Sequence, residues 1–127
     1  PQPYFPVRAT VNRMWIDIED EVPSKWFSAN IQDNVDFITS MRSSLESYGI
    51  EVGIYTTKTY WKNVMGNKFG FGSLKLWYPH YDENNSMGFA SDVLPFAGFD
   101  KVYIKQTQGN SATCGLSQID PDYMVDP

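Results

Sequence analysis

Two carboxylates near the start of the chain have a spacing that suits acid catalysis. Asp17 and Glu19 lie in the run Trp-Ile-Asp-Ile-Glu-Asp, whose apolar residues predict a buried strand. Side chains alternate between the two faces of a strand, so both carboxylates project from one face, roughly 6.6 to 6.8 Å apart along the backbone. Two like charges this close raise the pKa of one group, which leaves a proton donor beside an ionised carboxylate. Cleavage of a glycosidic bond uses such a pair.

The competing interpretation is a solvated cluster of acids at a strand end, which is the commoner origin of such a sequence. Against it, the apolar residues Trp15, Ile16 and Ile18 predict a buried strand. Asp20 and Glu21, which follow, are expected to form the solvated part of the cluster. The spacing of the two carboxylates leaves both retaining and inverting geometries open.

Capping signals and periodicity predict the elements that position these acids. After an extended segment over 1–12, a first strand is predicted over 13–18. Apolar steps of three and four predict a helix that begins after Ser28 or Asn30 and ends at Gly49. A second helix, capped at Thr56-Thr57, is predicted over 58–65 and ends at Gly66-Asn67. Further strands are predicted over 50–55, 74–81, 101–106 and 116–120, with no helix between the last three.

Two alternations of strand and helix predict right-handed crossovers and a parallel sheet, hence an α/β fold. Acids and aromatic residues at the carboxyl ends of the strands favour a barrel-like site at that face. Closure of such a barrel takes about eight strands, so we expect further strands outside this chain. The chain begins at Pro1, without a methionine or a positively charged, apolar leader, so we expect the start of the gene product, including any signal peptide, to lie outside this sequence.

The composition predicts one globular domain and excludes several classes of partner. Of the 127 residues, 42% are hydrophobic and 20% charged. The formal net charge of −5 and the absence of a basic patch disfavour nucleic-acid binding. No apolar run approaches the ~20 residues of a membrane span. Cys114 is expected to be a small buried residue, or to pair with a cysteine in a segment outside this chain.

Polar and aromatic side chains also occur at the other strand ends. Tyr78 and His80 share one face of their strand, whereas Trp77 and Tyr81 share the other. Core packing is the favoured role for Trp77. The sequence has a single histidine, so it cannot form a histidine cluster that binds zinc. The sequence has neither a Gly-x-Ser-x-Gly motif nor a glycine-rich phosphate loop. The residues expected at the same edge of the sheet are Tyr55, Tyr78, His80, Tyr81, Asp82 and Gln106.

Two more acids follow the last predicted strand. Asp120 and Asp122 lie in Gln-Ile-Asp-Pro-Asp-Tyr, where Asp-Pro is typical of a turn. Because Asp120 directly follows the strand, a carboxylate that orients a substrate is the alternative interpretation.

The segment Asn84-Asn85-Ser86 has the pattern of an N-glycosylation acceptor, which applies if the protein is secreted.

These motifs, in this order, resemble the family-25 glycoside hydrolases, the lysozymes of the Chalaropsis type, and within them the branch seen in nematodes and amoebae. The resemblance implies an irregular TIM-like (β/α)5(β)3 barrel of which this chain supplies about the last five strands. Residues 1–127 would then be one partial glycoside hydrolase domain, the C-terminal portion of the barrel. The segments that carry the resemblance are 15–19, 53–56, 76–82, 104–106 and 119–120.

The resemblance also implies roles for individual residues. Glu19 is expected to be the general acid, with Asp17 orienting the acetamido group of the substrate and Asp120 assisting from the opposite side. The implied reaction is hydrolysis of the β-1,4 bond from N-acetylmuramic acid to N-acetylglucosamine in bacterial peptidoglycan. No metal or cofactor is implied, and the expected location is secreted, lysosomal or phagosomal. The side chains expected to line the sugar-binding groove are Tyr55, Tyr78, His80 and Gln106.

The sequence departs from the family because nothing before Trp15 supplies the further site aspartate expected near the amino terminus. We therefore expect either a fragment of a longer lysozyme or an incomplete gene model, which is the favoured interpretation, or a divergent protein that has lost part of the barrel. Two alternative functions stay open. One is an inactive fragment or pseudoenzyme that keeps a carbohydrate-binding groove. The other is an interaction protein that uses its acidic surface, whose binding would weaken with salt. The oligomeric state is open as well.

Overall fold

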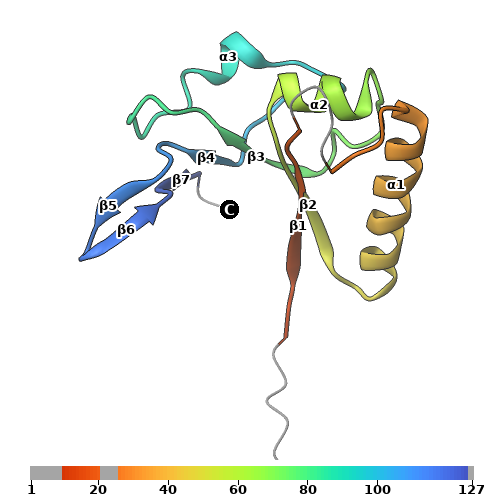
Figure 1. Ribbon diagram of the computed structural model, residues 1–127, viewed down its shortest axis with the longest axis horizontal. Coiled ribbons are helices and arrows are strands. Elements are labelled where there is room, and N and C mark those ends of the chain that lie inside the picture. Colours follow the sequence, from red (N-terminus) through yellow and green to blue (C-terminus); the bar gives the residue numbers. More distant parts are fainter. Residues whose placement is uncertain (1–9, 21–25, 126–127) are drawn as a thin grey trace, which may run out of the picture.

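A five-stranded sheet with the strand order β1-β2-β3-β4-β7 organises the chain. The computed structural model describes residues 10–20 and 26–125. A separate two-stranded hairpin, β5-β6, projects from one end of the structure (Figure 1). The elements in chain order are β1 (Arg13–Ile18), α1 (Ile31–Ser47), β2 (Glu51–Thr56), α2 (Lys58–Met65), β3 (Lys75–Pro79), α3 (Ala90–Val93), β4 (Ile104–Gln106), β5 (Ser111–Thr113), β6 (Leu116–Ile119) and β7 (Asp122–Met124).

The first four strands of the sheet run parallel, and only β7 runs antiparallel to its neighbour β4. Helix α1 connects β1 to β2, and α2 connects β2 to β3. This is the pattern that parallel neighbours require, since their connection must cross from one end of the sheet to the other. The predicted α/β class is confirmed.

Both crossover helices begin and end at the residues that the capping signals indicate. The Asn30 side chain accepts a hydrogen bond from the backbone N–H of Gln32 at 2.9 Å and so caps α1. Gly49, with φ +73°, follows its last turn in the left-handed conformation that glycine adopts at little cost. Thr57 caps α2 in the same way, with its hydroxyl accepting from the backbone N–H of Tyr60 at 3.1 Å.

The hydrophobic core lies between these helices and one face of the sheet. Ile18, Ile54 and Leu76 come from three neighbouring strands and are fully buried. Trp61 of α2 packs edge-on against Phe99, with ring centroids 5.2 Å apart. Because strand side chains alternate, the residues between these core positions must point to the other face, away from the core that α1 and α2 cover.

The end of the chain differs from the prediction. The predicted strand 116–120 exists as β6, but it pairs with β5 in the hairpin and not with the sheet. The sheet position beside β4 belongs instead to β7. The reason is a reversal at Cys114 and Gly115, whose φ angles of 52° and 73° turn the chain back on itself before it reaches the sheet.

Two smaller expectations were also wrong. Cys114 is exposed at the β5–β6 turn and is not a buried apolar residue. A one-turn helix, α3, lies between β3 and β4, where no helix was predicted, because four residues are too few to give a periodic signal. The segment 1–9 and Glu21 lie outside the described residues. No helix in the described part of the chain has the length and apolarity to span a membrane.

Candidate active site

The open face of the sheet carries a row of polar and aromatic side chains at its carboxyl end. The parallel register pairs Asp17 with Tyr55 and Tyr55 with Trp77, so these three side chains stand side by side on one face. On the neighbouring strands, Gln106 pairs with Asp122, and both share the Trp77 face. The register therefore brings together residues that are far apart in the sequence.

Asp17 and Glu19 lie next to each other on this face, as the alternation predicts, while Ile16 and Ile18 are buried on the other. The two carboxyl groups share a hydrogen bond. Loss of hydration, the charge of Asp17 and that hydrogen bond raise the pKa of Glu19 to about 7. Burial also raises the pKa of Asp17, but its hydrogen bond with Glu19 opposes the rise. In the hydrogen bond between the two groups, the protonated Glu19 carboxyl therefore donates and the Asp17 carboxylate accepts.

A hollow of about 620 Å³ opens beside the pair and is lined by Asp17, Glu19, Trp26, Phe27 and Phe37. Trp26 and Phe37 are 82% and 56% exposed, so aromatic surface meets solvent directly beside the carboxylates. Aromatic faces of this kind suit ligands that carry both apolar and polar surface.

Asp20 holds the backbone at Trp26 and Phe27, two of the aromatic residues beside the hollow. Its carboxylate accepts hydrogen bonds from the backbone N–H groups of Trp26, at 3.4 Å, and Phe27, at 3.2 Å. Asp20 is 7% exposed, so the expectation that it belongs to the solvated part of the acid cluster was wrong. A buried carboxylate requires such donors, and the loop backbone provides them.

Three aromatic rings continue the open face from β1 to β3. Trp77 contacts Trp15 edge-on at a centroid distance of 5.5 Å and Tyr55 at 5.1 Å. Gly53 makes this possible, because a Cβ atom there would overlap the Trp15 ring. Core packing was the role expected for Trp77, but the ring is half-buried on the open face and its Nε1 donates to Asp122 Oδ1 at 2.8 Å.

Gln106 joins two tyrosines at the edge of the row. The hydroxyls of Tyr55 and Tyr81 both donate to its Oε1, at 2.7 and 2.8 Å. Burial, followed by the negative charge of Glu19, raises the pKa of Tyr55 above its ordinary value, so the phenol stays neutral and keeps its proton. Tyr55 and Gln106 thus lie on the same face as Asp17 and are held together.

Tyr78 and His80 do not join this face. Tyr78 is buried on the helix side, where its hydroxyl accepts from the backbone N–H of Lys58 at 3.2 Å. The His80 ring stacks on Phe89, with centroids 4.5 Å apart and an interplanar angle of 13°. Tyr78 and His80 were predicted to line the groove, but the structure places them away from the face of Asp17, because the register aligns Trp77, and not Tyr78, with Asp17.

The two late acids have different surroundings. Asp120 is exposed and its Oδ1 accepts from the backbone N–H of Asn110 at 2.8 Å, which fits the predicted turn. Its negative charge also contributes to the raised pKa of Glu19, so it lies within electrostatic reach of the pair. Asp122 lies on β7, and burial raises its pKa although the hydrogen bond from Trp77 opposes this. Sequence reasoning assigned Asp122 no role beyond the turn.

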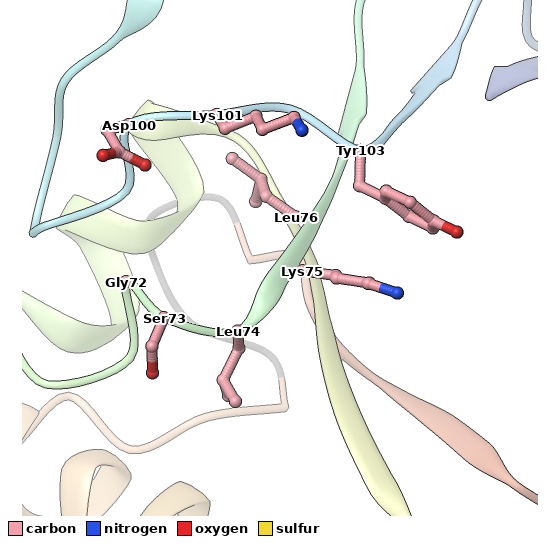
Figure 2. A pocket seen from close by; sticks show the side chains of 8 residues that line it. All are labelled: Gly72, Ser73, Leu74, Lys75, Leu76, Asp100, Lys101 and Tyr103. Carbon is pink, nitrogen blue, oxygen red and sulfur yellow. The ribbon is translucent and has the colours of Figure 1, made fainter. Parts of the chain in front are cut away.

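The opposite end of the sheet holds a smaller hollow of about 360 Å³, lined by 72–76, Asp100, Lys101 and Tyr103. Figure 2 shows Lys75 and Tyr103 projecting to the same side of the strands, and the Lys75 ammonium lies 4.3 Å from the Tyr103 ring centroid. Within the described residues, no group of three or more histidine, cysteine or acidic side chains is arranged to hold a metal ion.

Comparison of the sequence with known proteins identifies the family of this chain. The family model described as lysozyme-like protein 1 matches residues 7–107. A probable GH family 25 lysozyme from Dictyostelium discoideum, lysozyme 2, is 36% identical over 108 residues, which cover 85% of this chain and 48% of that protein. Lysozyme-like protein 5 of Caenorhabditis elegans is 34% identical over 116 residues, covering 90% of this chain and 50% of that protein. The chain spans about half the length of these two relatives, and only 21% of a third one, probable GH family 25 lysozyme 3 of Dictyostelium discoideum.

A solved structure supports the fold. The muramidase from Trichobolus zukalii superposes with a TM-score of 0.65 at 19% sequence identity, covering 89% of this chain and 50% of that one. The predicted resemblance to the family is confirmed, and the mixed α/β sheet has a muramidase-like fold.

Proposed function

Because the chain belongs to the family described as lysozyme-like protein 1, we propose that it acts in hydrolysis of bacterial peptidoglycan. The bond cleaved is the β-1,4 linkage from N-acetylmuramic acid to N-acetylglucosamine. The observation that carries the proposal is the placement of Glu19 beside Asp17 on an open face lined with aromatic rings, where burial and the charge of Asp17 raise the pKa of Glu19 to about 7. An acid with such a pKa keeps its proton in mildly acidic solution and can still release it during a reaction.

Glu19 protonates the glycosidic oxygen as the bond to the leaving sugar breaks. Asp17, the acceptor of the hydrogen bond, becomes the charged partner and orients the acetamido group of the substrate, as the family resemblance implies. Asp120, whose charge acts on Glu19, adds further negative charge at the site, which favours a positively charged transition state.

The aromatic row and Gln106 bind the glycan. Sugar rings carry apolar C–H faces that pack on aromatic side chains, and hydroxyl groups that pair with amides and phenols. Tyr55 and Tyr81 fix the Gln106 amide through its Oε1, which leaves its N–H₂ group to donate to a sugar oxygen.

Glycan binding without turnover is the second candidate function. The row Trp15, Tyr55 and Trp77 supports it, since these rings need no titrating group to bind a sugar. The two functions differ in their dependence on Glu19, because binding survives the loss of that carboxyl group and hydrolysis does not.

The test is release of reducing ends from purified peptidoglycan by this chain and by Glu19→Gln, with the products reduced and identified by mass spectrometry. Muropeptides that end in reduced muramic acid, absent with Glu19→Gln, are the expected result. Glu51→Gln, an acid at the other end of the sheet, is the matched control and should keep activity. No release by the folded chain, or release that survives Glu19→Gln, would contradict the proposal.

The proposed site of action is outside the cell or in a lysosomal or phagosomal compartment. Below pH 7 most Glu19 side chains hold a proton, so the general acid is ready to react. The net charge of −5 repels anionic cell walls. Acid conditions protonate carboxylates and so reduce this repulsion. An activity optimum above neutral pH would count against this location.

A further inference from the structure

The loop that follows β3 carries an N-glycosylation acceptor pattern in an exposed position. Asn84-Asn85-Ser86 is the only Asn-x-Ser or Asn-x-Thr segment in the 127 residues. All three residues are exposed. An acceptor asparagine that is free of the core can carry a bulky, solvated sugar chain without disturbing packing.

The backbone of this loop is fixed by one buried cation and does not depend on the asparagine side chains. Lys105 is 0% exposed, and its ammonium donates to Asp82 Oδ1 at 2.5 Å. The same ammonium donates to the carbonyl oxygens of Asn84, at 2.7 Å, and Ser86, at 3.2 Å. A buried lysine requires several acceptors, and this loop supplies them with its carbonyl groups. The carbonyl groups therefore face inward.

The segment 84–86 is held on the side of the sheet away from the candidate active site, whereas Tyr81, earlier in the same loop, reaches Gln106 on the open face. In the β3–β4 register Lys105 pairs with Tyr78, and both point to the helix side. Its ammonium lies 4.9 Å from the ring centroid of Phe89, on the same side. Trp77 and Gln106 occupy the opposite face. A sugar chain that begins at Asn84 would leave the open face accessible.

We propose that Asn84 is a site of N-linked glycosylation. The Asn84 amide nitrogen attacks the anomeric carbon of an oligosaccharide carried on a lipid pyrophosphate. A nitrogen–carbon bond forms and the carbon–oxygen bond to the pyrophosphate breaks. The lipid pyrophosphate leaves with the bonding electron pair, and the amide proton passes to a base of the transferase. The class of partner is therefore an oligosaccharyltransferase of the secretory pathway.

The experiment expresses the chain behind a secretory leader in a eukaryotic host and measures the intact mass of the secreted product before and after treatment with peptide N-glycosidase F. The expected result is the added mass of one glycan, removed by the enzyme, which leaves an aspartate in place of Asn84. Asn84→Gln should be secreted without that mass.

Two matched variants keep the pattern and should keep the glycan. Asn85→Gln changes an equally exposed neighbour without altering the acceptor or the hydroxyl residue. Ser86→Thr keeps a hydroxyl that can accept from the backbone N–H of Gly88, as Ser86 does at 3.1 Å. A secreted wild-type chain whose mass the enzyme does not change would overturn the proposal. A glycan that persists in Asn84→Gln would overturn it too.

Discussion

Glu19 and Glu51 are the same side chain at opposite ends of one sheet, and their surroundings shift their pKa values in opposite directions. Glu51 Oε2 accepts from Arg13 at 2.9 Å, and the Lys75 ammonium lies 3.5 Å from its other oxygen. The hydrogen bond from Arg13 is the largest cause that lowers the pKa of Glu51. Glu19 instead loses hydration beside the negative charge of Asp17, which raises its pKa to about 7.

The difference shows that Glu51 has a structural role, whereas the surroundings of Glu19 suit a role in proton transfer. A carboxylate between cations stays ionised and holds two strands together, but it has no proton to give. A carboxyl group beside another acid is less stable when ionised, and it releases its proton only when something draws it away. The two ends of the sheet thus show that neighbouring charges and burial decide the pKa of an otherwise identical glutamate.

Asp17→Asn should produce the largest effect on activity, because it removes the negative charge beside Glu19 that Glu51, at the other end of the sheet, lacks. The proposed hydrolysis should fall by about 100-fold or more, since the partner of the general acid is lost. The pKa of Glu19 should also fall, although it should stay above its ordinary value because burial, the largest cause, remains. Reducing-end release measured across pH would show the alkaline limb, near pH 7 in the wild type, moving to lower pH.

Asp100→Asn is the matched control, because Asp100 lies beside the hollow at the amino end of the sheet. Its rate and pH profile should equal those of the wild type. An unchanged alkaline limb in Asp17→Asn would show that Asp17 does not set the protonation of Glu19.

Gln106→Leu should have the next largest effect, on stability. Two tyrosine hydroxyls donate to the same Oε1, and the substitution leaves both without that acceptor. The free energy of unfolding should fall by about 1–3 kcal/mol. Tyr55→Phe removes one donor and keeps the acceptor, so it should cost less. Urea unfolding of the two variants checks this order, and equal losses would contradict the shared-acceptor arrangement.

Local sequence signals were enough to predict the two crossover helices, α1 and α2, and the first strand. Asn30, Thr57 and the two glycines at 49 and 66 act on their own neighbours, so their effect can be read without knowing the fold. The hairpin β5-β6 and the strand β7 were not predicted as such. Strands this short have little periodic signal, and their pairing depends on the sheet edge that the rest of the chain provides.

The candidate site shows the same limit. The alternation of strand side chains correctly predicted that Asp17 and Glu19 share a face and that Tyr78 and Trp77 lie on opposite faces. It could not show whether Tyr78 or Trp77 lies on the same face as Asp17. That choice depends on the register between β2 and β3, which is a tertiary property. Asp122 was interpreted as part of a turn for the same reason, because its contact with Trp77 spans 45 residues.

Glu19→Gln should change the pH dependence of stability. The folded pKa of Glu19, about 7, is above its ordinary value of 4.5, so its contribution to stability is fully present below pH 4.5 and is lost as pH rises through 7. The glutamine variant lacks this loss and should gain about 1 kcal/mol over the wild type between those pH values, after allowance for the solvent exposure of the site. Urea unfolding at pH 4.5 and pH 8 measures the difference. A gap that does not widen with pH would mean that Glu19 titrates normally.

Glu51→Gln should have the smallest effect and the opposite dependence on pH. Its folded pKa is lowered, so its stabilising contribution is present above the unfolded value and is lost as pH falls through the folded one. The pair with Arg13 is half-exposed, and such pairs contribute about 0.5 kcal/mol. The variant should therefore be slightly less stable than the wild type at pH 7 and equal to it in strong acid. Added salt should shrink the difference at pH 7, because it screens exposed charges. A gap between wild type and Glu51→Gln that grows toward acid pH would reverse the sign and remove the contrast with Glu19.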